Sequence, residues 1–240
     1  MQHLPFNERA KQPRKVVVLT GAGISVASGL KPYRGPGGLW TANPELANRM
    51  VAGIDAETLW TVTCDWRKEL SAAEPNAAHR ALAAFEKELL ARGGTFTLIT
   101  QNVDGLHSLA GSVNVLEFHG SLRRSRCSVA CGANAFGDDR KDEPVPVCSA
   151  CGAPVRPDIV LFNEMIGAFE DWSAKRALRE CDLFVAIGTS GTVSPASNFV
   201  RSAAYAGAHT VLVNLETSDA VPFAEVIRGE AQSLVPELFQ

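Results

Sequence analysis

The fold is decided by the stretch Lys15-Val16-Val17-Val18-Leu19-Thr20-Gly21-Ala22-Gly23. Residues Val16–Leu19 are apolar on both faces and rich in β-branched side chains, as in a central strand of a parallel sheet. The glycines then allow a tight turn, which we expect to lead into a helix N-terminus. Such a turn lets the backbone approach a pyrophosphate and supplies free N–H groups.

The glycine turn also fits a strand-to-helix connection that binds nothing. The next glycine is Gly29, so the G-x-G-x-x-G fingerprint is incomplete, which disfavours a dehydrogenase-type site.

Three more strands are predicted, and the clearest helical pattern runs from about Asn76 to Arg92. The strands are Phe96–Thr100, Leu183–Gly188 and Thr210–Leu215. Strands that alternate with helices indicate an α/β fold with a mostly parallel sheet.

Composition fits an ordinary globular protein. The 240 residues are 46% hydrophobic and 20% charged, with a formal net charge of -3, so no basic field indicates a nucleic-acid partner. No apolar run reaches the roughly 18 residues that span a bilayer, and the N-terminal segment lacks a signal-peptide core. We therefore expect no nucleic-acid or membrane partner and a cytoplasmic location.

Two stretches break the alternation of strands and helices. Residues 31–73 are irregular and then helical, and residues 122–156 contain four cysteines. We expect both to form a smaller domain inserted into a core of residues 1–30, 74–121 and 157–240. The cysteines, Cys127-x3-Cys131 and Cys148-x2-Cys151, are spaced like a zinc ribbon. Four thiolates leave no open coordination position, so the predicted zinc is structural. Cys64 and Cys181 are expected to be buried apolar fillers.

Polar clusters follow four strands. They are Thr100-Gln101-Asn102-Val103-Asp104-Gly105, Glu117-Phe118-His119-Gly120-Ser121, Gly188-Thr189-Ser190 and Asn214-Leu215-Glu216. In an open α/β sheet, ligands lie outside the carboxyl ends of the strands, so these clusters are expected to converge there. Singly, each is more typical of a turn or cap. Among five histidines we expect His79 and His209 on surfaces, whereas His119 is the best candidate for a general base.

Together these motifs, in this order, resemble the sirtuin family from about Val16 to Leu234, in its bacterial type. Further matching pieces are Tyr33-Arg34-Gly35, Gly38-Leu39-Trp40 and Arg156-Pro157-Asp158-Ile159-Val160-Leu161-Phe162-Asn163-Glu164. The resemblance implies a Rossmann-like core and a small domain with a zinc ribbon and a helical module. It also implies that NAD and an acyl-lysine meet in the cleft between them, and that the products are free lysine, nicotinamide and O-acyl-ADP-ribose.

The resemblance also implies residue roles. His119 is the base, Asn102 and Gln101 position the nicotinamide ribose, and Asp104 accepts from the nicotinamide carboxamide. The remaining cofactor contacts are expected from Gly21, Ala22, Gly23, Ser25, Tyr33, Arg34, Gly188, Thr189, Ser190, Asn214 and Glu216. The substrate contacts are Val160 and Phe162, which line the acyl-lysine tunnel, and Asn163, which pairs with the substrate backbone. The zinc ligands are Cys127, Cys131, Cys148 and Cys151.

Several positions depart from the family pattern. Tyr33 replaces a phenylalanine of the cofactor loop, and Asn163 replaces a glycine, although asparagine tolerates a positive φ. The branch nearest this chain contains desuccinylases, which read an acidic acyl group with a Tyr-x-x-Arg pair. Here Thr63 and Trp66 stand at those places, and Arg67 is one residue late. A buried carboxylate would lack its bidentate partner, so we expect acetyl and other neutral acyl groups to be preferred.

Three alternatives remain. One is a mono-ADP-ribosyltransferase that uses the same NAD cleft, which His119 disfavours. A second is a desuccinylase. The third is a module that binds NAD or ADP-ribose without turnover, which would not need the set Gln101, Asn102, Asp104 and His119.

Overall fold

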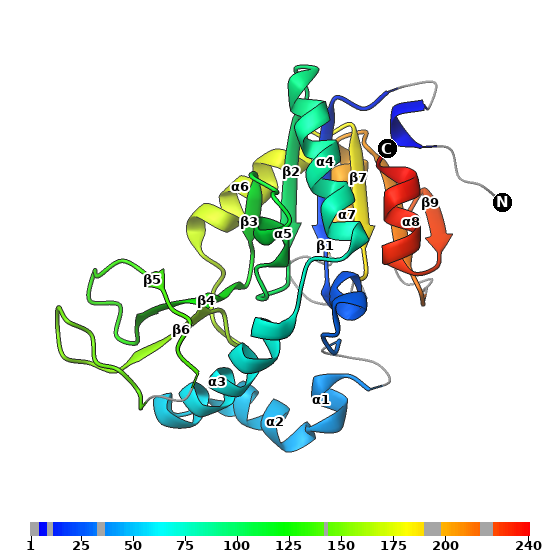
Figure 1. The fold of residues 1–240 in the computed structure, drawn as a ribbon. Coiled ribbons are helices and arrows are strands. Elements are labelled where there is room, and N and C mark those ends of the chain that lie inside the picture. The colour runs from blue at the N-terminus through cyan, green and yellow to red at the C-terminus, as the bar shows by residue number, and fades with distance from the viewer. Residues whose placement is uncertain (1–4, 9–11, 33–36, 142–143, 190–197, 217–222) are drawn as a thin grey trace.

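The computed structural model describes residues 5–8, 12–32, 37–141, 144–189, 198–216 and 223–240. Six strands form one parallel sheet in the spatial order β3-β2-β1-β7-β8-β9 (Figure 1). Numbered along the chain, this order is 3-2-1-4-5-6, the arrangement of a Rossmann sheet. The predicted Rossmann-like α/β core is confirmed. The strands are β1 Lys15–Thr20, β2 Thr95–Thr100, β3 Val115–Glu117, β7 Leu183–Ile187, β8 His209–Asn214 and β9 Glu225–Arg228.

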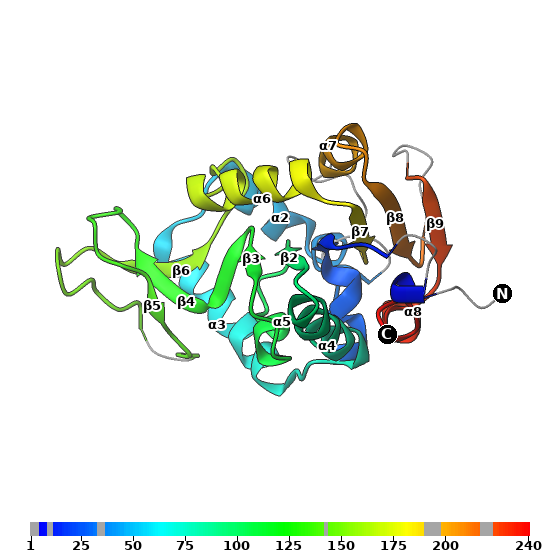
Figure 2. The same cartoon turned by 90° about the horizontal axis from the view of Figure 1, so that it is seen from above.

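Helices cover both faces of this sheet (Figure 2). On one face lie α4 (Ala77–Ala91) and α8 (Ala231–Leu238), and on the other lie α6 (Ala168–Glu180) and α7 (Phe199–Tyr205). Alternate residues of β1 enter the two cores: Val16 and Val18 pack with the α4 side, and Val17 and Leu19 with the α6 side. This double coverage explains why β1 is a continuous apolar run. Shorter elements are η1 (Phe6–Glu8), η2 (Ala22–Ser28) and α5 (Leu106–Leu109).

Helix α4 matches the helix predicted from the sequence. Its N-cap, Asn76, accepts a hydrogen bond from the Ala78 N–H and donates to the Ile24 carbonyl, so the cap ties α4 to the loop after β1. The expectation of a surface position for His79 is wrong, because this side chain is fully buried. Its ring packs against His107 at 4.7 Å between centroids, since α4 is covered by α5 as well as by the sheet.

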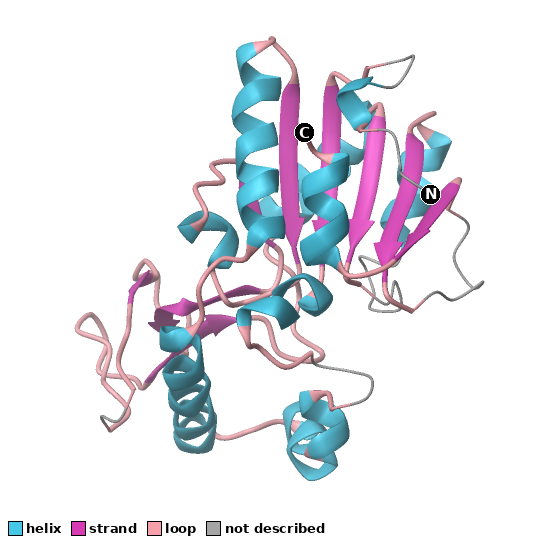
Figure 3. Ribbon diagram, turned by 45° about the vertical axis from the view of Figure 1, so that its right-hand side comes forward, coloured by secondary structure: helices cyan, strands magenta, loops and turns pink. Residues whose placement is uncertain are grey.

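A smaller lobe lies beyond the carboxyl edge of the large sheet (Figure 3). It combines helices α1 (Leu39–Ala42), α2 (Pro44–Ala52) and α3 (Ala56–Ala72) with a three-stranded antiparallel sheet in the order β5-β4-β6. These strands are β4 Gly120–Cys127, β5 Phe136–Gly137 and β6 Val155–Ile159. Trp60 and Cys64 of α3 pack against Cys127, Cys148 and Val155, so the helical module rests on the cysteine-containing loops.

Residues 31–73 contain the helices α1, α2 and α3, and residues 122–156 contain β5 and most of β4. The small sheet itself begins at Gly120 and ends at Ile159, a few residues beyond the second range. The division into domains at the predicted boundaries stays a prediction. In the described part of the chain, no helix is both long enough and apolar enough to cross a membrane.

Candidate active site

A cleft of about 780 Å³ runs along the carboxyl edge of the large sheet, where the small lobe faces it. It opens between β1 and β7, the point at which the strand order reverses and at which open α/β sheets bind ligands. The sheet side of its lining comes from the loops after β1, β2, β7 and β8, so the predicted polar clusters do converge. These lining residues are Gly21, Ala22, Gly23, Gln101, Asn102, Gly188, Thr189, Asn214 and Glu216.

The glycine turn packs against the loop that follows β7. The Gly21 N–H donates to the Ile187 carbonyl at 3.0 Å, and the Gly23 N–H donates to the Gly188 carbonyl at 2.9 Å. A Cβ atom on Gly23 would lie 2.7 Å from the Gly188 Cα, so no larger residue fits. The glycines are therefore needed for contact between two loops, which the sequence alone could not show. The helix that follows the glycine turn, η2, is a 3-10 helix.

Side chains lock the loop after β1 to the loop after β2. Asn102 Nδ2 donates to the Gly21 carbonyl and to Ser25 Oγ, both at 3.1 Å, and Ser25 Oγ donates to Asp104 Oδ2 at 2.8 Å. Ser25 and Asp104 lie behind Asn102, and only Asn102 is among the lining residues. The Asn102 Oδ1 atom is buried and accepts no hydrogen bond from any described residue. An acceptor of this kind fits a ligand that brings a donor into the cleft.

Asp104 is almost fully buried, and burial raises the pKa of its carboxyl above the ordinary value. Hydrogen bonds from the Leu106 N–H and from Ser25 oppose this rise, because they stabilise the carboxylate. The carboxyl therefore holds Ser25 in place at an electrostatic cost, and removing one of its donors would make the buried charge harder to maintain.

His119 lies between β3 and β4 and lines the cleft. Its Nδ1 atom is 2.9 Å from the Gln101 carbonyl oxygen. Because a carbonyl can only accept, Nδ1 carries the proton and Nε2 is left as the basic nitrogen. Burial lowers the pKa of the imidazole below its ordinary value, although the Gln101 carbonyl opposes this shift. The ring is therefore neutral at neutral pH, the state that a general base requires.

The other described histidines do not reach the cleft. His107 is buried behind the sheet edge, where its Nε2 is 2.9 Å from Thr20 Oγ1. Burial moves the pKa of His107 well below the ordinary histidine value and that of His79 to about 4. His209 is exposed, as expected, and pairs with Glu225 at 3.0 Å. Of the described histidines, His119 alone is placed for chemistry in the cleft.

On the sheet side of the cleft, hydrogen bonds also join the loops that follow β2, β7 and β8. Thr189 Oγ1 donates to Gln101 Oε1 at 2.9 Å, and Asn214 Nδ2 donates to the carbonyls of Thr189 and Glu216. Residues 229–232, at the start of α8, complete this wall, and sequence reasoning missed them because they carry no motif. Tyr33, Arg34 and Ser190 were predicted to bind the cofactor, and all three lie outside the described residues.

The opposite wall is formed by the segment after β6. The predicted substrate residues Val160, Phe162 and Asn163 line the cleft. The Val160 N–H donates to the His119 carbonyl at 2.9 Å, so this segment begins beside the candidate base. Asn163 has φ +67, a left-handed conformation in which asparagine costs less than most residues. Its Nδ2 donates to the Val51 carbonyl at the end of α2 at 3.1 Å.

The four predicted zinc ligands come together in the small lobe. Their Sγ atoms lie within 4.8 Å of one another, with 3.5 Å between Cys127 and Cys151 and 3.7 Å between Cys131 and Cys148. A tetrahedral zinc with Zn–S bonds of about 2.3 Å holds its sulfurs roughly 3.8 Å apart, so the set fits zinc. Cys64 and Cys181 are buried and lie outside the cluster, as predicted.

Comparison with known proteins settles the family. A family model described as the Sir2 family matches residues 21–195. The chain belongs to the Sir2 family. An NAD-dependent protein deacylase of Thermus thermophilus is 44% identical over 224 residues, which are 91% of this chain and 86% of the relative.

Solved Sir2 structures share the whole fold. A Sir2 homolog–NAD complex is 36% identical, with a TM-score of 0.83 and coverage of 95% of this chain and 89% of that chain. A Sir2 complex with a deacetylated p53 peptide and 3'-O-acetyl ADP ribose is 27% identical, with a TM-score of 0.77 and coverage of 94% and 92%. The predicted sirtuin resemblance of bacterial type is confirmed.

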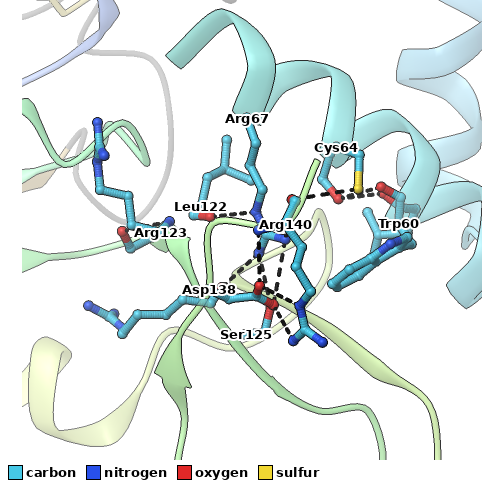
Figure 4. A network of polar contacts seen from close by, with 12 residues as sticks. Trp60, Cys64, Arg67, Leu122, Arg123, Ser125, Asp138 and Arg140 are labelled. Carbon is cyan, nitrogen blue, oxygen red and sulfur yellow. Dashed lines mark hydrogen bonds and ion pairs between the residues drawn. The ribbon is translucent and has the colours of Figure 1, made fainter. Parts of the chain in front are cut away.

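The positions at which an acidic acyl group is expected to be read, Thr63 and Trp66, lie on α3, and Arg67 of this helix makes its contacts elsewhere. Arg67 is 4% exposed; its Nε donates to the Leu122 carbonyl at 2.7 Å and its Nη2 donates to Ser125 Oγ at 2.8 Å (Figure 4). It also pairs with buried Asp138 at 3.6 Å. Trp66 lines the cleft, whereas Thr63 is buried and donates to the Leu59 carbonyl. The guanidinium therefore joins α3 to the zinc ribbon.

Proposed function

We propose that this chain is an NAD-dependent protein-lysine deacylase that releases nicotinamide and O-acyl-ADP-ribose and prefers acetyl and other neutral acyl groups. One observation carries the proposal. At the switch point of a Rossmann sheet, a single cleft brings the neutral imidazole of His119 beside the buried Asn102 and the segment Val160–Asn163. Deacylation of acyl-lysine in proteins or peptides is the activity of the family to which the chain belongs.

The cofactor is NAD, which supplies the nicotinamide leaving group and the ribose that accepts the acyl group. Asn102 is suited to orient the nicotinamide ribose, because its Oδ1 faces no competing protein donor in the described structure. Gln101 is fixed by the hydroxyl of Thr189, and Ser25 and Asp104 support Asn102 from behind. Asn214 and Glu216, with Gly188, Thr189 and Ser190, are proposed for the adenosine half. Tyr33 and Arg34 are proposed to cover nicotinamide.

His119 is proposed to take a proton from a ribose hydroxyl through Nε2, which activates that oxygen for attack on the acyl carbon. The Gln101 carbonyl keeps the proton on Nδ1 before this step and stabilises the imidazolium after it. A neutral ring is needed at the start, and the lowered pKa supplies it at neutral pH. Val160 and Phe162 would line the acyl-lysine tunnel, with Asn163 beside the substrate backbone.

The zinc is structural, because four thiolates close the coordination sphere. Cys127 ends β4 and Cys148 packs under Trp60, so the metal would hold the ribbon against the helical module. The four cysteines lie outside the residues that line the cleft, so the metal would have no part in the acyl transfer.

The acyl preference is supported by the charges in the cleft. Among its described lining residues there is no lysine or arginine, and the charged ones are Glu164, Glu216 and Glu230. A succinyl carboxylate would enter without a cationic partner among these described residues. The absence of nucleic-acid and membrane partners and the cytoplasmic location remain predictions from the sequence.

The proposal is tested with an acetyl-lysine peptide incubated with and without NAD. We expect free lysine, nicotinamide and O-acetyl-ADP-ribose to form in equal amounts, and only when NAD is present. Transfer of ADP-ribose to a protein without loss of the acetyl group would favour the transferase instead. NAD binding without any turnover would favour a pure binding module, and deacetylation without NAD would contradict the proposal.

A further inference from the structure

Helix α6 has an apolar face on each side. Ala174 and Leu178 point inward and are fully buried in the core against the large sheet. On the outside, Phe169 is 67% exposed and Trp172 is 53% exposed, and Met165, just before the helix, is 91% exposed. The inner face explains why α6 packs on the sheet. The outer aromatic residues have no such explanation.

The outer residues form one row. Positions 169, 172 and 176 are spaced by three and four residues, so they share a helix face, and at about 100° per residue this face lies opposite Ala174 and Leu178. The Arg176 guanidinium lies over the Trp172 ring, 5.4 Å from its centroid. Phe169 and Arg176 are about 10 Å apart along the axis. We call Met165, Phe169, Trp172 and Arg176 the α6 stripe.

The α6 stripe begins at the rim of the cleft. Phe162, Asn163 and Ile166 line the cleft, and Met165 lies between them in the chain with its side chain exposed. Phe169 follows four residues later, in the first turn of α6. Figure 1 shows α6 starting where the chain returns from β6 and then running along the large sheet, away from the small lobe. The stripe therefore continues the proposed substrate wall outward onto the surface.

The composition of the stripe is that of a protein contact. Tryptophan and arginine dominate the residues that contribute most to interfaces, and methionine adapts to different partners. Single exposed apolar residues are normal on any surface, as with Tyr205 of α7, which is 97% exposed. The stripe differs because Phe169, Trp172 and Arg176 share one helix face and the segment that carries them continues from the proposed substrate wall.

We propose that the α6 stripe is a docking surface for the folded body of an acylated protein substrate, next to the lysine that enters the cleft. This inference rests on the proposed deacylase function. A peptide with two residues on each side of the lysine extends only about 7 Å from it and engages the cleft alone. A folded protein also covers the rim. The stripe therefore raises kcat/KM for deacylation of folded proteins and does not change kcat/KM for short peptides.

The test compares two substrates, an acetyl-lysine pentapeptide and lysozyme acetylated on its lysines with acetic anhydride. The double variant Phe169→Ala/Trp172→Ala should lose at least fivefold in kcat/KM on the acetylated protein and less than twofold on the peptide. Trp172→Phe should keep most of the activity on the protein. Tyr205→Ala, which removes an exposed aromatic side chain outside the stripe, is the matched control and should change neither value.

An equal loss on both substrates, or no loss on either, would overturn the inference. A different oligomeric state of the double variant and the wild type, measured by light scattering, would also overturn the inference. The stripe would then be a contact between two copies of the chain. Thermal unfolding of the double variant should match that of the wild type, because the replaced side chains are exposed. A wild-type protein without NAD-dependent activity on the pentapeptide would refute the proposed function itself, and the inference with it.

Discussion

The two walls of the cleft are held in different ways. On the sheet wall, hydrogen bonds of 2.8–3.1 Å join Ser25, Asn102 and Asp104, and all three side chains are buried. On the lobe wall, Phe162 is 37% exposed and Asn163 reaches across to α2 through one bond to the Val51 carbonyl. The sheet wall is preorganised for chemistry, whereas the lobe wall leaves part of its apolar lining exposed to a substrate.

A second buried layer supports the sheet wall. Thr20 Oγ1 donates to Thr100 Oγ1 at 2.9 Å, and Thr100 Oγ1 accepts from the Asn102 N–H at 3.1 Å. His107 contacts Thr20 from behind, and His79 packs on His107. Changes on this wall should therefore alter stability or the chemical step, whereas changes on the lobe wall should alter substrate choice.

The largest effect is expected from the metal that supports the lobe wall. Cys148→Ser should remove zinc and unfold the ribbon, because structural zinc binding in small modules contributes roughly 10 kcal/mol or more to folding. Metal analysis and thermal unfolding measure both results. Cys181→Ala is the control, since this buried thiol lies outside the cluster and the variant should keep its zinc. A folded, zinc-free Cys148→Ser protein of unchanged stability would rule out the four-thiolate site.

The next largest effect is expected from buried His79, whose protonation should make the free energy of unfolding depend on pH. The pKa of His79 is about 4 in the folded state and 6.5 when unfolded, so the unfolded state binds the proton between these values. The free energy of unfolding should be unaffected by His79 above pH 6.5 and should fall by about 3 kcal/mol as the pH drops to 4. Denaturant unfolding at several pH values measures this loss.

The matched variant for this prediction is His79→Gln. Its amide can still accept from the Asn76 N–H in the capping box, but it does not titrate. Below pH 6.5 its free energy of unfolding should fall less steeply than that of the wild type. Parallel curves for the two proteins would show that His79 binds its proton equally well in the folded and unfolded states, against the lowered pKa.

A smaller effect is expected on acyl selectivity at the lobe wall. The wild type should process an acetyl-lysine peptide at least 10-fold more efficiently than its succinyl counterpart, because a missing charge-assisted bond costs about 1.5–3 kcal/mol. Trp66→Arg, which places a guanidinium in the cleft lining, should narrow this ratio. Faster turnover of the succinyl peptide by the wild type would refute the neutral preference.

The smallest effect is expected at Asn163. Asn163→Gly keeps the left-handed backbone and removes the bond to Val51, so KM for a peptide should rise about two- to fivefold while kcat stays within twofold. Asn163→Asp, which cannot donate to the carbonyl, should behave like the glycine variant. A large loss of kcat at constant KM would instead place Asn163 in the chemical step.

The sequence predicted those parts whose signal is local. An apolar run predicts strand β1, and a helical period with an N-cap predicts helix α4. The spacing of the four cysteines between Cys127 and Cys151 predicts the zinc ligands. The convergence of polar strand ends followed from the rule for parallel sheets.

The rest depends on contacts between distant segments. His79 is buried because α5 covers a second side of α4, and Gly23 is required by its contact with Gly188. Strand β9 is a short edge strand with mixed burial, so its pattern was too weak to predict. Residues 229–232 of the cleft wall come directly after β9 and carry no motif, so the sequence did not predict them either.

The most direct test of the account is the rate of acyl-lysine turnover by His119→Ala, measured beside its affinity for NAD. We predict a fall of about 10²–10⁴ in turnover with NAD affinity within a few-fold of the wild type. In the wild type, kcat/KM should fall with decreasing pH only below 6.5, because burial lowers the pKa of His119. Turnover by His119→Ala at the wild-type rate would contradict the assignment of the base.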